Sequence, residues 1–230
     1  MQTLIDIGIL LAAYIFGSIP IGLLVVRFST GKDIREIESG RTGGTNAMRA
    51  AGFWAGLLTA MLDILKGAVS VWAAQAISPE SHVIHVLAPV ATIIGHNYSI
   101  FLIERDQSGN IVRFRGGAGG APAVGGAVGL WPPSLLIILP LGMLTFFTIG
   151  IASVTTMSVA LFAIIIFAVR AAQGLMPWFD VMYGVFAEIL LIWALRPNLQ
   201  KLLAGQERIV KYSLNGWLRK RNEKNKHVDK

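Results

Sequence analysis

The sequence contains no cysteine, which excludes disulfide bonds and thiol chemistry. Charged residues are also scarce, at 14% of the 230 residues, whereas a soluble domain usually carries about a quarter. No lysine or arginine precedes Arg27, so the N-terminus lacks the positive segment of a secretory signal peptide. We therefore expect the first apolar block to be retained as a membrane span.

Hydrophobic residues make up 54% of the chain and come in blocks about as long as a bilayer is thick. These blocks predict an all-α polytopic membrane protein, because an open sheet would leave backbone groups unsatisfied in lipid. Seven spans are predicted, at about 3–26, 52–77, 83–103, 117–131, 134–153, 155–173 and 178–196. We expect residues 1–205 to form one transmembrane domain and residues 206–230 to form a basic cytoplasmic tail.

The positive charges fit the seven-span arrangement. It places 18 of the 20 lysines and arginines on one side, in the segments 27–51, 104–116 and 196–230. The positive-inside rule makes that side cytoplasmic, with the N-terminus outside and the C-terminus inside. Only Lys66, within a span, and Arg170, near the opposite end, are left over.

The tail from 206 to 230 permits two interpretations. It is either a solvated cytoplasmic tail, or an interfacial segment in which Leu214, Trp217 and Leu218 lie on the lipid headgroups. Nucleic-acid binding is not expected, because the chain has no folded basic domain.

The first basic loop reads "ESGRTGGTNAMRAAG" over residues 38–52. Its hydroxyl and amide side chains can hydrogen-bond phosphate oxygens, and Arg41 and Arg49 can add charge-assisted contacts. The following apolar run suggests a helix N-terminus, which favours anions. The alternative is an ordinary connecting loop, since loops are rich in these residue types.

The glycine-rich stretch "RFRGGAGGAPAVGGAVG" covers residues 113–129 and matches neither the P-loop nor the G-x-G-x-x-G pattern. Its first glycines could form a nest of amides for an anion, with Arg113 and Arg115 as counter-charges. Its last three, Gly125, Gly126 and Gly129, are more typical of close helix packing in membranes.

Three further observations concern ionisable residues within the spans. Asp63 and Lys66 are three residues apart, so they share one helical face and are expected to pair, although Lys66 could instead reach into a site. Glu188 has no obvious partner in the sequence. His96 has no companion at ligand spacing, so no metal site is expected. With no nucleophile–base pair visible, an enzyme would work by positioning and charge stabilisation.

Six motifs occur together and in order along nearly the whole chain. They are "GSIPIG" (17–22), "SGRTGGTNAMR" (39–49), "LDILKG" (62–67), "GHNYSIFL" (95–102), "FRGGAGGA" (114–121) and "NLQKLLAGQE" (198–207). This set resembles the bacterial acyl-phosphate:glycerol-3-phosphate acyltransferase family.

The resemblance implies a seven-span enzyme of the bacterial inner membrane with its active site at the cytoplasmic face. Such enzymes transfer a fatty acyl group from acyl phosphate to glycerol 3-phosphate, giving lysophosphatidic acid and phosphate in phospholipid biosynthesis. The implied partners are these two substrates and membrane lipids, with no cofactor. The substrate-binding residues implied are Ser39, Gly40, Gly43, Thr45, Asn46, Arg49, His96, Arg115, Gly116, Gly117, Gly119, Ser153, Arg196 and Asn198.

The chain departs from the family pattern at charged and polar positions. Arg41 stands where the family usually has asparagine, and Ala118 stands where it has a second lysine. Further departures are Pro122, Phe147, Gly150, Leu195 and Pro197. These replacements leave an alternative open, a catalytically weakened relative that binds lipid phosphate or modulates a paralogous enzyme. A small transporter or channel is a third alternative, disfavoured because the fifth and sixth spans are almost pure hydrocarbon.

Overall fold

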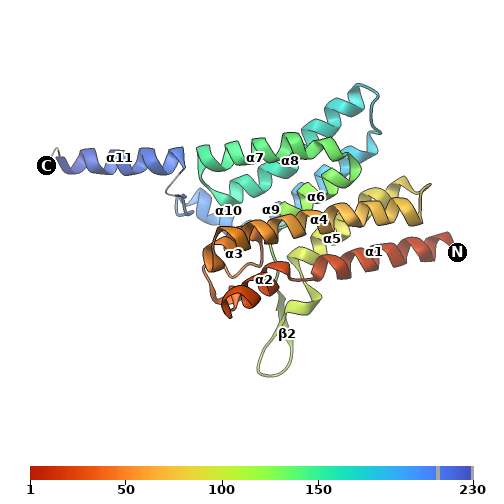
Figure 1. Ribbon diagram of the computed structural model, residues 1–230, viewed down its shortest axis with the longest axis horizontal. Coiled ribbons are helices and arrows are strands. Elements are labelled where there is room, and N and C mark those ends of the chain that lie inside the picture. The colour runs from red at the N-terminus through yellow and green to blue at the C-terminus, as the bar shows by residue number, and fades with distance from the viewer. Residues whose placement is uncertain (211–212, 229–230) are drawn as a thin grey trace.

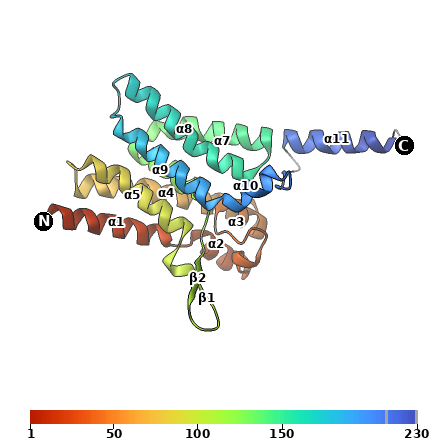
Figure 2. The ribbon, with the colours of Figure 1, turned by 180° about the vertical axis from the view of Figure 1, so that it is seen from behind.

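The protein is a bundle of helices, described here by a computed structural model over residues 1–210 and 213–228 (Figure 1). The helices are α1 (Gln2–Ser18), α2 (Ile21–Thr30), α3 (Gly44–Ala51), α4 (Phe53–Ile77), α5 (His82–Asn97), α6 (Gly120–Leu130), α7 (Leu135–Ile149), α8 (Ala152–Ala172), α9 (Phe179–Ala194), α10 (Arg196–Leu203) and α11 (Leu214–Val228). Helices α1 and α11 lie at opposite ends of the long axis (Figures 1 and 2).

Five helical segments of the described chain are long and apolar enough to cross a membrane. They are Gln2–Thr30, Phe53–Ile77, His82–Leu102, Pro132–Ile149 and Ala152–Ala172. Large apolar side chains such as Leu4, Leu136 and Ile189 are exposed on the sides of the bundle. A soluble protein rarely leaves so much apolar surface uncovered. A predominantly helical membrane fold is therefore supported, while the count of seven spans stays a prediction.

The first predicted span, 3–26, is broken in the structure. Helix α1 ends at Ser18 and α2 begins at Ile21, with Ile19 and Pro20 between them. Proline lacks a backbone N–H and disfavours helical geometry at the residue before it, so the helix stops there. The break leaves carbonyl groups at the end of α1 without helical partners, and the functional site uses them.

Two other predicted spans have bounds that differ by a few residues from the observed helices, both at the end of the bundle that carries the polar residues. The span predicted at 117–131 begins as a helix only at Gly120, and the span predicted at 178–196 ends at Ala194, where α10 follows. In both places a short non-helical stretch faces the same cavity.

A two-stranded hairpin interrupts the otherwise helical fold, which the sequence did not predict. Strand β1 (Ile103–Arg105) pairs antiparallel with β2 (Ile111–Phe114). The turn between the strands is fixed by Asp106, whose Oδ1 accepts the backbone N–H groups of Ser108 at 2.8 Å and Asn110 at 2.9 Å.

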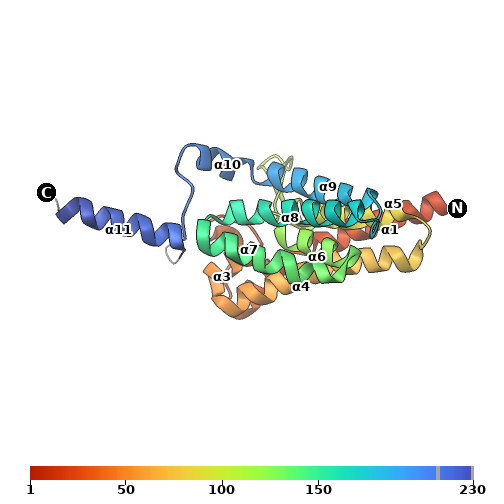
Figure 3. The same cartoon turned by 90° about the horizontal axis from the view of Figure 1, so that it is seen from above.

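Helix α6 lies at the centre of the bundle, packed against α4, α5, α8 and α9 (Figure 3). Its contact with α4 is a backbone-to-backbone approach. A Cβ atom at Gly125 would collide with the carbonyl oxygen of Ile64 and lie 3.0 Å from the Cα of Gly67. The prediction that Gly125, Gly126 and Gly129 pack helices closely is confirmed.

The tail contains a helix, α11, which extends away from the bundle (Figure 1). Its first turn touches the end of α7, where Asn215 Nδ2 donates to the carbonyl of Ile149 at 3.1 Å. Leu214, Trp217 and Leu218 are exposed. Of the tail predicted over 206–230, residues 211–212 and 229–230 lie outside the described residues.

Candidate functional site

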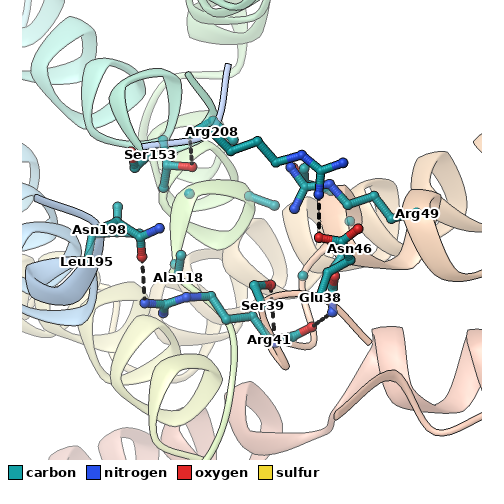
Figure 4. Close-up of a pocket in the computed structure, with 18 of the residues that line it drawn as sticks. Glu38, Ser39, Arg41, Asn46, Arg49, Ala118, Ser153, Leu195, Asn198 and Arg208 are labelled. Carbon is teal, nitrogen blue, oxygen red and sulfur yellow. Dashed lines mark hydrogen bonds and ion pairs between the residues drawn. The ribbon is translucent and has the colours of Figure 1, made fainter. Parts of the chain in front are cut away.

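A polar cavity of about 370 Å³ lies at the end of the bundle opposite the N-terminus (Figure 4). Six parts of the chain enclose it: the loop before α3 with α3 itself, α4, the end of α5, the start of α6 with Ala118, the start of α8, and α10 with Leu195 and residues 206–208. We call residues 206–208 the C-terminal segment. The cavity is lined by Glu38, Ser39, Arg41, Gly43, Gly44, Thr45, Asn46, Arg49, Ala60, Asp63, His96, Ala118, Gly119, Gly120, Ala121, Ala152, Ser153, Thr156, Leu195, Asn198, Lys201, Gln206, Glu207 and Arg208.

The loop before α3 is held in shape by one buried amide. Asn46 Nδ2 donates to the backbone carbonyls of Ile34, Ile37 and Arg41, at 3.1, 3.0 and 2.9 Å. These bonds fold residues 34–41 back against α3. Asn46 Oδ1 has no hydrogen-bond partner among the described residues. The asparagine therefore organises the cavity wall as well as lining it.

The glycine-rich stretch meets the cavity at the N-terminus of α6. Gly119 is the N-cap and has φ of 87°, a conformation that side-chain-bearing residues rarely adopt. The first backbone N–H groups of a helix have no intrahelical partners and favour anions. Pro122 lies in the first turn, where its missing N–H costs nothing. The replacement at this position therefore leaves the helix start intact.

A buried ionic cluster forms the inner wall of the cavity. Asp63 is fully buried and its Oδ1 lies 2.9 Å from Lys66 Nζ and 3.5 Å from His96 Nδ1. The predicted pair of Asp63 and Lys66 is confirmed. Lys66 also donates to the carbonyls of Gly17 at 2.9 Å and Ile19 at 3.2 Å, the groups freed by the break after α1. The pair thus joins α4 to the end of α1. Through His96, α5 also contacts Asp63 of this pair.

The C-terminal segment covers one side of the cavity. Glu207 Oε1 accepts from Ser153 Oγ at 3.1 Å and from Asn198 Nδ2 at 2.9 Å. Across the cavity, Arg208 forms an ion pair with Glu38 (Figure 4). The hydrogen bond from Arg208 lowers the pKa of the Glu38 carboxyl. These three contacts connect the C-terminal segment to the start of α8, to α10 and to the first loop.

Nine of the fourteen residues predicted to bind substrate line this cavity: Ser39, Gly43, Thr45, Asn46, Arg49, His96, Gly119, Ser153 and Asn198. They come from five separate parts of the sequence. The structure therefore brings most of the predicted set together in one place.

The other five predicted residues lie outside the cavity lining. Arg115 pairs with Glu104 of the hairpin and donates to the carbonyl of Arg35 at 3.1 Å. Arg196 stacks over Trp193, 3.5 Å from the ring centroid, and donates to its carbonyl at 2.9 Å. The remaining three are Gly40, Gly116 and Gly117.

Those three glycines support the cavity wall from behind. The backbone carbonyl of Gly116 accepts from Thr42 at 3.2 Å, and the N–H of Gly117 donates to the His96 carbonyl at 2.8 Å. A Cβ atom at Gly40 would lie 3.0 Å from the carbonyl oxygen of Arg35. Their place in the structure is thus close packing between the first loop, α5 and the glycine-rich stretch.

The lining includes charged residues that the predicted set omitted: Glu38, Arg41, Asp63, Lys201, Glu207 and Arg208. Lys201 and Glu207 lie within the motif "NLQKLLAGQE", so that motif was the available signal. Glu38 and Arg208 are 170 positions apart, and no local pattern connects them.

A helical bundle with exposed apolar sides and a polar cavity at one end defines a multi-pass membrane protein with a polar site. Comparison with known proteins narrows this class. The model of the glycerol-3-phosphate acyltransferase family matches residues 7–205, and the chain belongs to that family.

Similar proteins cover most of the chain. A glycerol-3-phosphate acyltransferase of Thermus thermophilus is 36% identical over 199 residues, which are 86% of this chain and 92% of the relative. Glycerol-3-phosphate acyltransferase 2 of Moorella thermoacetica is 35% identical over 201 residues, covering 86% of this chain and 94% of the relative.

The fold also matches solved structures. The crystal structure of PlsY (YgiH), an integral membrane glycerol 3-phosphate acyltransferase, in its glycerol 3-phosphate form superimposes with a TM-score of 0.74 at 24% identity. The match covers 89% of this chain and 95% of the crystallised one. The lysophosphatidic acid form of PlsY matches with a TM-score of 0.73 at 23% identity. These matches establish the fold.

Proposed function

We propose that this protein transfers a fatty acyl group from acyl phosphate to glycerol 3-phosphate, giving lysophosphatidic acid and inorganic phosphate. A hydroxyl oxygen of glycerol 3-phosphate attacks the acyl carbon, the bond from that carbon to the phosphate oxygen breaks, and the hydroxyl proton ends on the released phosphate. The donor is a mixed anhydride and already activated, so the reaction requires neither a covalent enzyme intermediate nor a cofactor. Positioning and charge stabilisation carry the catalysis.

The observation that carries this proposal is the composition of the cavity. Its wall combines Arg41, Arg49 and Lys201 with hydroxyl and amide groups and the N-terminus of α6. Both substrates carry phosphate, and such groups bind it through charge-assisted hydrogen bonds. The sides of the bundle expose apolar side chains, which suit the lipid environment in which a fatty acyl chain is soluble. The curated relatives named glycerol-3-phosphate acyltransferase supply independent support.

We further propose that the cavity faces the cytoplasm of a bacterial cell from the inner membrane. The cavity lies at the end of the bundle where the basic segments gather, and the positive-inside rule places such segments in the cytoplasm. The N-terminus, at the opposite end, is then outside.

Replacing Arg49 with alanine is the first test of this function. Arg49 lines the cavity from the last turn of α3, and losing one charge-assisted contact to phosphate costs about 1.5–3 kcal/mol. We therefore expect kcat/KM to fall roughly 10- to 150-fold. The measurement is phosphate release by purified protein supplied with both acyl phosphate and glycerol 3-phosphate.

Arg105→Ala is the matched control, because Arg105 lies on the hairpin and its side chain donates only to the carbonyl of Gly109 among the described residues. It should behave like the unmodified protein. Phosphate release that needs both substrates supports the proposal. Binding of either substrate without turnover would instead favour the weakened-relative alternative.

A further inference from the structure

The basic residues around the cavity differ in whether a carboxylate already neutralises them. Four arginines of this region are paired, as Arg35–Asp33, Arg113–Glu104, Arg115–Glu104 and Arg208–Glu38. Three cations of the cavity wall have no carboxylate within 4.0 Å in the described parts of the chain: Arg41, Arg49 and Lys201. These three are free to neutralise an incoming anion.

Arg41 differs from the other two in its burial. Arg49 and Lys201 are exposed, whereas Arg41 is half-buried between the first loop, the glycine-rich stretch and the end of α9. Its guanidinium donates only to neutral acceptors. Nη2 bonds the carbonyl of Ala194 at 2.7 Å and Oδ1 of Asn198 at 3.2 Å, and Nη1 bonds the carbonyl of Gly117 at 3.2 Å.

This placement leaves a positive charge partly withdrawn from water and without a counter-ion in contact. Burial lowers the pKa of Arg41, and the carboxylate of Glu207 acts against that shift. An arginine nevertheless stays protonated in proteins. A partly desolvated charge is unfavourable until an opposite charge approaches it. Arg41 is therefore suited to bind an anion within the cavity.

We propose that Arg41 binds a substrate phosphate and supplies the positive charge that position 118 lacks. The bond from Nη1 to the Gly117 carbonyl places the guanidinium next to Ala118, and both residues line the cavity (Figure 4). The N-terminus of α6 begins two residues further on and favours the same charge. The guanidinium of Arg41 thus lies where a charged side chain at position 118 would place its own positive charge.

In Figure 4 the guanidinium of Arg41 lies apart from Arg49 and Arg208. Arg49 and Arg208 lie with Glu38 on one side, while Arg41 lies with Asn198 and Ala118 on the other. Two separate cationic positions fit a reaction in which each of two substrates carries a phosphate. The inference rests on the proposed function and assigns Arg41 to one of those two phosphates.

A charge-relocation experiment tests the assignment. We compare Arg41→Asn, Ala118→Lys and the double variant, measuring KM for acyl phosphate and for glycerol 3-phosphate separately. Arg41→Asn should raise KM about tenfold or more for one substrate, which identifies the phosphate that Arg41 binds. The double variant should bring that KM back to within about threefold of the unmodified value, since the introduced lysine restores the charge. Arg105→Asn is the control for loss of a surface arginine.

Two outcomes would overturn the inference. KM values for both substrates that stay within about twofold in Arg41→Asn would show that the residue binds neither phosphate. An equal rise for both substrates without rescue by Ala118→Lys, together with a lower melting temperature, would show that Arg41 only ties α9 to the first loop.

Binding measurements separate this inference from the proposed reaction. If the unmodified protein releases no phosphate, the proposed function fails, and Arg41 is tested by titrating glycerol 3-phosphate and inorganic phosphate into detergent-solubilised protein. A dissociation constant about tenfold weaker or more in Arg41→Asn for either probe supports the role. If Arg41→Asn binds both probes as tightly as the unmodified protein does, the role is contradicted.

Discussion

Replacing Asp63 with asparagine should destabilise the protein by about 3–5 kcal/mol, the usual result of removing one partner of a buried ion pair. The substitution keeps the shape of the side chain but leaves Lys66, which is 2% exposed, without its carboxylate. The remaining acceptors of Lys66 are the carbonyls of Gly17 and Ile19, which are neutral. The measurement is unfolding of the detergent-solubilised protein by heat or denaturant.

A double variant distinguishes the ion pair from other contributions of Asp63. Asp63→Asn combined with Lys66→Met removes both charges, so we expect it to be less destabilised than Asp63→Asn alone. If Asp63→Asn were within about 1 kcal/mol of the unmodified protein, the pair would not be a major tie between α4 and the end of α1.

Replacing Gly125 with alanine should destabilise the protein about as much as Asp63→Asn does, although it adds a single methyl group. That methyl would collide with the carbonyl oxygen of Ile64, a backbone atom of α4 that cannot move aside as a flexible side chain can. We expect a loss of about 3 kcal/mol, at the upper end of the range for overpacked cores. Activity should fall as well, because α4 carries Asp63 and α6 begins at the cavity. Thermal unfolding and phosphate release check both effects.

Gly8 provides the matched control for this change. A Cβ atom at Gly8, in the middle of α1, would have no atom within 4 Å. Alanine there should raise stability by up to about 1 kcal/mol, since glycine is the poorer helix former. Opposite signs at the two positions would identify the collision as the cause. Equal changes in stability at the two positions would show instead that both substitutions act through helix propensity.

The residues that differ from the family pattern are distributed unevenly around the site. Ala118 and Leu195 line the cavity, whereas Gly150 forms the left-handed C-cap of α7 and Phe147 is exposed on the same helix. A loss of function through these replacements would therefore act mainly through Ala118 and Leu195. Arg41 lies beside the first of them.

Features that depend on spacing along one segment could be predicted from the sequence. The apolar blocks indicated a helical membrane protein, and the i, i+3 spacing of Asp63 and Lys66 predicted their pair. The small residues of α6 predicted its close packing, and the ordered motifs indicated the family. Each of these features depends on the spacing of residues within one segment or on the length of that segment, and both can be read from the sequence.

The composition of the cavity was decided only by tertiary structure. Its wall joins residues from 38 to 208, and the direction of each side chain depends on how helices far apart in sequence are rotated against one another. Arg115 and Arg41 each stand next to a glycine in a basic loop. The hairpin nevertheless supplies the carboxylate of Glu104 to Arg115, whereas the end of α9 supplies Arg41 with a neutral carbonyl, that of Ala194. The sequence by itself therefore determined the membrane class and the family, while packing determined which charges remain available inside the cavity.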